Sequence, residues 1–211
     1  MGKYNVYSIA NWFSNNNRKT RESTRDGNLT LNKLLYFADS FNYAIKGEKL
    51  INENPVGYAN GPVYQKVYVN HRHYYAQDIL STEEKLSDDT IELLKIVNFI
   101  FGNYSATDLS DITHNQSPWK NKEEDCKLIH YNPILDFADF NDEEKENMIA
   151  LYSMYKDIDV DNMFVDKIGD NIVIYDKTTV LDEQDFAELE SLPNEEDSIF
   201  IEKIDGELVY G

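Results

Sequence analysis

Apolar residues recur along the first part of the chain with the spacing of amphipathic helices. One set follows the i, i+3, i+4, i+7 pattern that places side chains on one helix face, at Val6, Ile9, Ala10 and Phe13. A longer run of the same period spans 31–45 and ends at Gly47, the residue type that most often closes helices. We predict Thr30 as its N-cap, and the helix is long enough to form the core on which the others pack.

The segments around this helix are less regular. The polar stretch 18–27 predicts a surface loop, and it holds the basic cluster of Arg18, Lys19, Arg21 and Arg25. Because proline suits the first turn of a helix, Gly61-Pro62 predicts the start of a helix through Val63, Val67 and Tyr68. Three further N-caps are predicted for helices ending near Phe101, His114 and Tyr155, at Asp88 or Ser87, at Ser105 and at Asp142.

From Met163 onwards the apolar period changes from helical to two, which is typical of strands. Two pairs of apolar runs flank Gly169-Asp170-Asn171 and Asp205-Gly206, and each pair predicts a β-hairpin. Between them 181–192 predicts one short helix, which Pro193 ends. The fold class predicted is therefore mainly α, with a compact multi-helix domain at 1–156 and a small α+β (ββαββ) appendage at 157–211.

Charge is spread unevenly over these two parts. The net charge is −19; residues 1–156 hold 17 Lys and Arg against 22 Asp and Glu, whereas residues 157–211 hold 3 against 17. Such a field repels nucleic-acid phosphates and attracts basic protein surfaces. The simpler alternative is an acidic face that only maintains solubility.

Composition adds three expectations. An apolar content of 41% is enough for a buried core. The single cysteine, Cys126, excludes an internal disulfide and is expected to be buried and inert. The sequence shows no signal-peptide pattern at its start and no run of the ~20 apolar residues that a membrane span needs, so we expect a cytoplasmic protein without membrane contact.

Three sequence segments carry a family resemblance through their order and spacing. They are Lys33-Leu34-Leu35-Tyr36-Phe37-Ala38, then Asn60-Gly61-Pro62-Val63-Tyr64 with Tyr68, and then Leu109-Ser110-Asp111-Ile112-Thr113-His114 with Pro118 and Trp119. Over residues 1–156 the chain resembles the Panacea family, the SocA-like antitoxin domain of bacterial toxin–antitoxin loci and phage genomes. The resemblance implies a Panacea-type helical domain that neutralises a cognate toxin by direct protein–protein binding, sometimes as an adaptor for a host protease. It implies neither an enzyme nor a cofactor.

Exposed aromatic residues are the expected anchors of such an interface, because they bury a large area for little lost rotamer entropy. The candidates are Tyr36, Tyr64, Tyr68 and Trp119, each of which has a place in the core as its alternative. Acidic residues would steer a basic toxin towards the chain. We expect no metal site: His71 and His73 are two residues apart and point about 200° apart on a helix.

Three rival functions stay open. The acidic appendage could imitate phosphate spacing, as in a phage-encoded inhibitor or DNA mimic that acts on a host nucleic-acid enzyme. Asp111 could orient and charge His114 for catalysis, but no nucleophile motif, phosphate loop or metal cluster accompanies this pair. Direct nucleic-acid binding through the cluster between Arg18 and Arg25 is disfavoured by the overall negative field.

Overall fold

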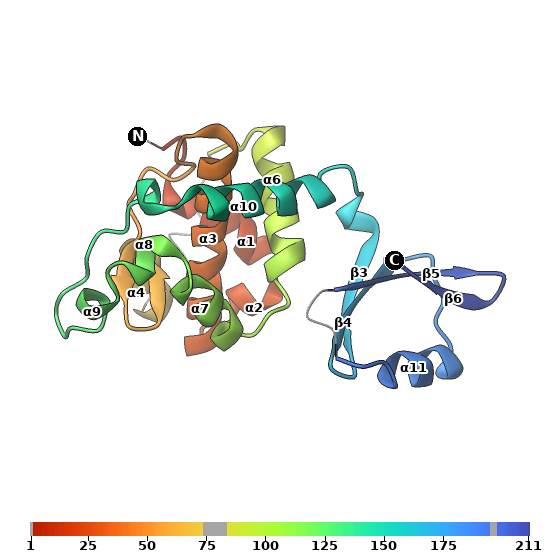
Figure 1. Ribbon diagram of the computed structural model, residues 1–211. Helices are drawn as coiled ribbons and strands as arrows, with labels where there is room; N and C mark the ends of the chain where they lie inside the picture. Colours follow the sequence, from red (N-terminus) through yellow and green to blue (C-terminus); the bar gives the residue numbers. More distant parts are fainter. Residues whose placement is uncertain (1, 74–83, 195–197) are drawn as a thin grey trace. The chain divides into compact units, whose positions relative to one another are not determined.

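The computed structural model of the protein describes residues 2–73, 84–194 and 198–211 (Figure 1). The chain divides into two compact units, Met1–Asp157 and Ile158–Gly211. The first unit is helical and the second holds a sheet with one α-helix, so the chain is mainly α.

The helical unit is built around one long central helix, α3 (Arg25–Lys46), against which its other long helices pack (Figure 1). The other described elements of this unit are α1 (Val6–Asn16), α2 (Arg18–Arg21), β1 (Val56–Tyr58), β2 (Gly61–Val63), α4 (Gln65–His73), α6 (Asp88–Phe101), α7 (Ala106–His114), α8 (Ser117–Lys120), α9 (Glu123–Cys126), η1 (Phe137–Asp139) and α10 (Asp142–Tyr155). The predicted core helix is thus confirmed as the centre of the unit.

Helix α3 begins six residues earlier than the sequence predicts. Thr24 is its N-cap, with an extended backbone and a side-chain oxygen that accepts the N–H of Gly27. Thr30, the predicted cap, is instead buried inside the helix. Gly47 ends the helix in the left-handed conformation at φ 72°, as predicted.

The segment 18–27 lies mostly on the surface, as predicted, but it is not a loop, because it contains α2, a short link and the start of α3. Tertiary contacts hold it: the buried hydroxyl of Thr20 donates to the carbonyl of Phe13 at 3.1 Å. Gly27 lies so close to the carbonyl of Glu22 that a β carbon there would overlap it. Neither contact could be predicted from the sequence, because this stretch is polar and has no apolar period.

Gly61 and Pro62 form a strand rather than the predicted helix start. Strand β2 pairs antiparallel with β1 in the register Val56–Val63, Gly57–Pro62 and Tyr58–Gly61, and helix α4 begins only at Gln65. Gly61 has φ 95°, a conformation that glycine adopts without strain, at the end of the hairpin turn. The Gly-Pro pair therefore shapes a hairpin.

The remaining helix starts differ little from expectation. Ser87 precedes α6, and Ser105 caps α7 in a capping box with Asp108. At α10 the cap is Asn141, not the predicted Asp142: Asn141 accepts the backbone N–H of Glu144 at 2.9 Å and Glu144 bonds back. Asp142 instead occupies the first turn, where its charge suits the helix dipole.

The second unit is a four-stranded sheet in the order β3 (Met163–Ile168), β4 (Asn171–Asp176), β5 (Ile199–Ile204), β6 (Glu207–Tyr210). The outer pairs are antiparallel hairpins, and β4 pairs parallel with β5. The 3-10 turn η2 (Val160–Asn162) precedes β3 and helix α11 (Glu183–Glu190) lies between β4 and β5 in the chain. Its small core gathers Ile168, Val173, Tyr175, Leu189 and Ile201.

Candidate functional site

The three sequence segments meet at one buried amine. Lys33, on α3, is fully buried, and its Nζ donates to the carbonyl of Asn60 at 2.6 Å and to that of Pro62 at 3.3 Å. No carboxylate among the described residues pairs with it. Burial without a counter-charge lowers the pKa of Lys33 well below its ordinary value. The amine thus fastens the β1–β2 hairpin to the central helix.

The third segment closes this junction from the other side. Thr113, on α7, is fully buried, and a β carbon on Gly61 would overlap both its Oγ1 and the Nζ of Lys33. Only glycine fits between the two side chains at this point. The junction of Lys33, Gly61 and Thr113 therefore joins all three segments.

Trp119 packs directly behind the junction. Its Nε1 donates to the carbonyl of Tyr58 at 2.9 Å, and the ring of His114 stacks on it with centroids 3.9 Å apart and an interplanar angle of 27°. Trp119, Cys126 and Leu135 form a small separate core. Cys126 is buried, as predicted, and burial raises the pKa of its thiol to about 11, so it is unreactive.

His114 lacks the partners of a catalytic base. No hydrogen bond joins it to Asp111 among the described interactions, and its Nε2 is buried without a partner among the described residues. Desolvation lowers the pKa of His114, and the nearby charge of Lys33 adds to this, whereas Asp111 acts more weakly in the opposite direction. The imidazole is accordingly neutral at pH 7, and the Asp111–His114 pair is not formed in this structure.

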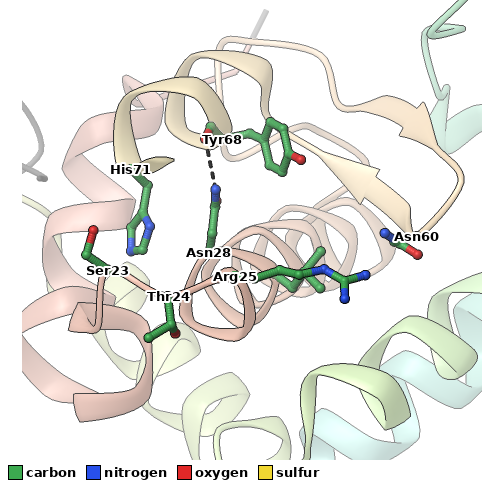
Figure 2. A pocket seen from close by; sticks show the side chains of 8 residues that line it. Ser23, Thr24, Arg25, Asn28, Asn60, Tyr68 and His71 are labelled. Atoms are coloured by element: carbon green, nitrogen blue, oxygen red, sulfur yellow. Dashed lines mark hydrogen bonds between the residues drawn. The ribbon is translucent and has the colours of Figure 1, made fainter. Parts of the chain in front are cut away.

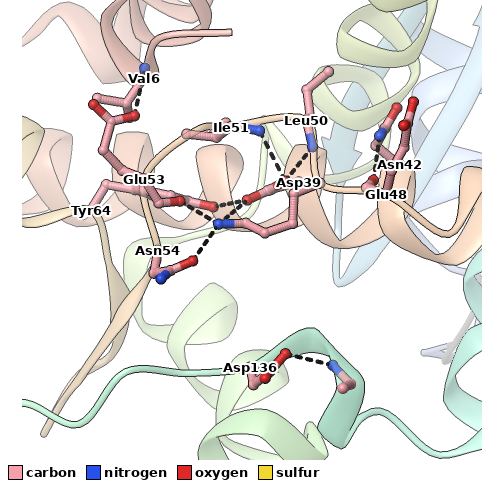
Figure 3. Close-up of polar contacts among 12 residues, drawn as sticks. Val6, Asp39, Asn42, Glu48, Leu50, Ile51, Glu53, Asn54, Tyr64 and Asp136 are labelled. Atoms are coloured by element: carbon pink, nitrogen blue, oxygen red, sulfur yellow. Dashed lines mark hydrogen bonds and ion pairs between the residues drawn. The ribbon is translucent and has the colours of Figure 1, made fainter. Parts of the chain in front are cut away.

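A second buried polar centre lies further along α3, at Asp39 (Figure 3). Its carboxylate accepts the backbone N–H groups of Leu50 at 2.6 Å and Ile51 at 3.1 Å and the hydroxyl of Tyr64 at 2.5 Å. Desolvation raises the pKa of Asp39 to about 6, although Tyr64 and then Lys49, whose Nζ lies 3.9 Å away, oppose it. This centre ties the segment after α3 and the start of α4 to the central helix.

Two polar side chains extend this centre to α1. Glu53 accepts the backbone N–H of Val6 at 3.2 Å (Figure 3). It also forms an ion pair with Lys66 at 2.7 Å. Lys49 donates to the side chain of Asn54 at 2.7 Å. The segment 47–54 is thereby held by side chains, together with a short backbone bridge between Ile51 and Tyr4.

Three of the four predicted aromatic anchors are not exposed. Tyr36, Tyr64 and Trp119 are at most 2% exposed and lie in the core, which was their alternative. The Tyr36 ring packs edge-on against Phe137 at 5.6 Å, and its hydroxyl has no partner among the described residues. Because a fully buried ring cannot contact a partner, the expectation that these three are exposed is wrong. Only Tyr68 is half-buried.

Tyr68 lies at a cavity of about 330 Å³ beside the N-terminus of α3 (Figure 2). The lining residues come from the α2–α3 connection, α3, the hairpin turn and α4: Ser23, Thr24, Arg25, Asn28, Leu29, Asn60, Tyr68 and His71. Asn28 holds the wall together by donating to the carbonyl of Tyr68 at 2.9 Å. Figure 2 shows Arg25 reaching towards Asn60, with the His71 ring on the side of Ser23. Part of the predicted basic cluster thus borders a cavity.

The structure also displays an apolar loop, residues 127–135, that sequence reasoning missed. It carries four exposed apolar side chains: Leu128, Ile129, Tyr131 and Ile134, of which Ile129 is 85% exposed. Backbone hydrogen bonds hold the C-terminal end of the loop against β1. The N–H of Leu135 donates to the carbonyl of Pro55 at 2.9 Å, and the N–H of Gly57 donates to the carbonyl of Pro133 at 2.8 Å. The apolar run within a polar stretch was a signal that could have identified it.

Two kinds of site are not found among the described residues. No group of three or more His, Cys, Asp or Glu side chains is placed to hold a metal ion there. In that same part of the chain, no helix is both long and apolar enough to cross a membrane. The side chain of His73, named above with His71, lies outside what the structure describes.

Comparison with known proteins gives one match. Residues 31–120 match the family described as antitoxin SocA-like, Panacea domain. The matched range includes all three sequence segments and the whole junction of Lys33, Gly61 and Thr113. The resemblance seen in the sequence is therefore confirmed over these residues. No curated protein and no solved structure matches the chain.

Proposed function

We propose that this chain, whose residues 31–120 match the SocA-like Panacea domain, is the antitoxin of a toxin–antitoxin system and neutralises its toxin by direct protein–protein binding. The family match is the observation that carries the proposal. The three sequence segments within this match are mostly buried, so they maintain the fold. Partner contacts then belong to residues on the surface.

The apolar loop supplies the best anchors for such a contact. Its exposed side chains lie close together in the sequence. The C-terminal end of the loop is fixed by the β1 contacts and by Lys122, which donates to the carbonyl of Ile134 at 2.8 Å. Exposed apolar residues on an ordered support are typical of interface centres, because little conformational entropy is lost when they are buried. These side chains replace Tyr36, Tyr64 and Trp119 as our proposed anchors.

The acidic second unit indicates which charge the partner should carry. With 17 acidic against 3 basic residues at 157–211, it favours a basic toxin and speeds the encounter at low salt. The same observation supports a second candidate function, inhibition of a host nucleic-acid enzyme by imitation of phosphate charges. Delivery of the toxin to a protease is a further possible outcome of binding, and catalysis is no part of the proposal.

Co-expression with the product of the neighbouring gene tests the proposal. We expect growth arrest by the neighbour alone, relief by this chain, and a stable complex in a pull-down. A harmless and unbound neighbour would contradict the antitoxin function. The second candidate predicts instead that a basic nucleic-acid enzyme is captured, and that changing Glu183, Glu190, Glu202 and Glu207 to Gln, all exposed, weakens that capture most at low salt.

A further inference from the structure

We propose that the cavity beside the N-terminus of α3 binds a small phosphate ester of mononucleotide size. This site goes beyond toxin binding, because the cavity lies apart from the apolar loop in the chain and takes a different ligand. Its volume of about 330 Å³ is at the lower end of the range for small-molecule sites.

Arg25 supplies the charge that the phosphate needs. No carboxylate among the described residues forms an ion pair with it, whereas Arg18 of the same basic cluster lies 3.9 Å from Glu22. The guanidinium presents its N–H groups in a planar fork that fits two oxygens of a phosphate. In a chain of net charge −19, an exposed arginine without a described partner at the mouth of a cavity indicates an anionic ligand.

The start of α3 adds two hydroxyl groups to the cavity wall, and Figure 2 places them on the side of His71, away from the Arg25 guanidinium. Thr24 uses its Oγ1 to accept the N–H of Gly27 and so keeps its own hydroxyl hydrogen for a ligand. Ser23 carries a second hydroxyl in the cavity wall.

His71 provides the independent observation from the buried end of the cavity. It is 3% exposed, and its Nε2 bonds to the carbonyl of Thr20 at 2.9 Å. Since a carbonyl only accepts, Nε2 carries the hydrogen, and in this tautomer Nδ1 is an acceptor. Nδ1 has no partner among the described residues. A buried acceptor of this kind in a cavity wall requires a donor, such as the amino group of a nucleobase.

The middle of the cavity suits a planar, polar body between these ends. Tyr68 contributes a half-buried aromatic ring, and the exposed side chain of Asn60, towards which Arg25 reaches in Figure 2, adds a polar group at the Arg25 end. A free phosphate would use only the Arg25 end, whereas a nucleoside monophosphate would contact both ends. The order of anion, aromatic wall and buried acceptor therefore favours the ester over the free ion.

Titration of the ¹⁵N-labelled full chain with AMP, GMP and inorganic phosphate tests the proposal, with NMR and calorimetry as readouts. We expect AMP or GMP to bind more tightly than phosphate and to shift the resonances of Arg25 Nε and His71 Nδ1. Arg25→Ala should weaken binding of the nucleotide by about tenfold or more, because it removes hydrogen bonds between charged groups.

Arg18→Ala is the matched control, since it removes the same charge from an exposed position that does not line the cavity. We expect it to change the affinity less than twofold. Equal weakening by the two variants would show unspecific attraction to the basic cluster and would overturn the proposal. The absence of binding by both nucleotides, or binding that leaves His71 Nδ1 unchanged, would overturn it as well. Neither result would affect the antitoxin function, which co-expression tests separately.

Discussion

The hydroxyl of Tyr64 donates to the buried carboxylate of Asp39 over 2.5 Å, across the interface between the central helix and the start of α4. Both side chains are at most 1% exposed. Tyr64 belongs to the second of the three sequence segments, so this bond joins the matched hairpin region to α3 at a second place besides Lys33.

Tyr64→Phe removes this donor while keeping the ring in place. The Asp39 oxygen then retains only Lys49 at 3.9 Å, and we expect a loss of about 1–3 kcal/mol in the free energy of unfolding. Urea unfolding followed by circular dichroism measures it. Tyr131→Phe, at a half-exposed position of the apolar loop, is the control and should change stability by less than about 0.5 kcal/mol. Equal effects would contradict the importance of the bond.

Protonation of Asp39 should make the stability of the fold depend on pH in the acidic range. Its pKa is raised from 3.8 to about 6 in the folded state, so the folded chain takes up a proton where the unfolded chain does not. The stability contributed is complete below about pH 4 and is lost as the pH rises to about 6, with a magnitude of order 3 kcal/mol. Unfolding of the wild type and Asp39→Asn from pH 4 to 7 should therefore give profiles of different slope. Parallel profiles would refute the prediction.

Lys33 should give the opposite pH dependence, with the free energy of unfolding increasing with pH in the alkaline range. Burial lowers its pKa in the folded state, so the unfolded chain binds the additional proton below its own pKa of 10.5. Stability from this group is present above pH 10.5 and is lost as the pH falls, by up to about 1.4 kcal/mol per pH unit. Lys33→Met should remove this increase in the free energy of unfolding between pH 8 and 10. Hydrogen exchange or urea unfolding at these pH values would show whether the variant keeps the wild-type slope.

Gly61→Ala should be more destabilising than an ordinary glycine substitution. Its φ of 95° already disfavours alanine, and the new methyl group would overlap Lys33 and Thr113. Gly47→Ala is the control, because its φ is 72° but open space surrounds it. We expect Gly61→Ala to cost about 1–3 kcal/mol more than this control. Combining it with Lys33→Met should then cost less than the sum of the two changes, because both act on one contact.

The apolar loop should control partner binding without controlling the fold. Ile129→Ser and Tyr131→Ser change exposed side chains, so thermal stability should shift little, whereas binding of the toxin should weaken by about 1–4 kcal/mol. Val180→Ser, at an apolar position 78% exposed in the second unit, serves as the control. Full toxin rescue by the loop variants at limiting expression would place the contact elsewhere.

The sequence predicted best what periodicity encodes. The central helix, the N-cap at Ser105 and the hairpin at Asp205-Gly206 follow from apolar spacing and local turn chemistry, and the structure has them. The predictions were least accurate where tertiary contacts determine the local structure. Thr24 and Thr30 are equally good N-cap residue types in isolation, and the helix begins after Thr24, where Gly27 packs against the carbonyl of Glu22.

The candidate sites show the same limit. Tyr36 and Tyr64 are aromatic residues that suit an interface and a core equally well, and their burial depends on helices far away in the chain. The charge of Arg25 is visible in the sequence, but the cavity beside it requires His71 from another helix. Asp39 gave no sequence signal, because a single carboxylate within an amphipathic helix is ordinary.

Helix α3 is held at fixed points along its length, with Lys33 bound to the hairpin and Asp39 bound to the segment after Gly47. One residue inserted between them would rotate one attachment by about 100° relative to the other and break it. The length of this stretch is thus fixed by its two attachments. Among the described interactions, the tip of the apolar loop at 127–135 has no such attachment, so substitutions there should cost little stability. Under the proposed function, a change of partner would then require changes in the loop and none in the attachments of α3.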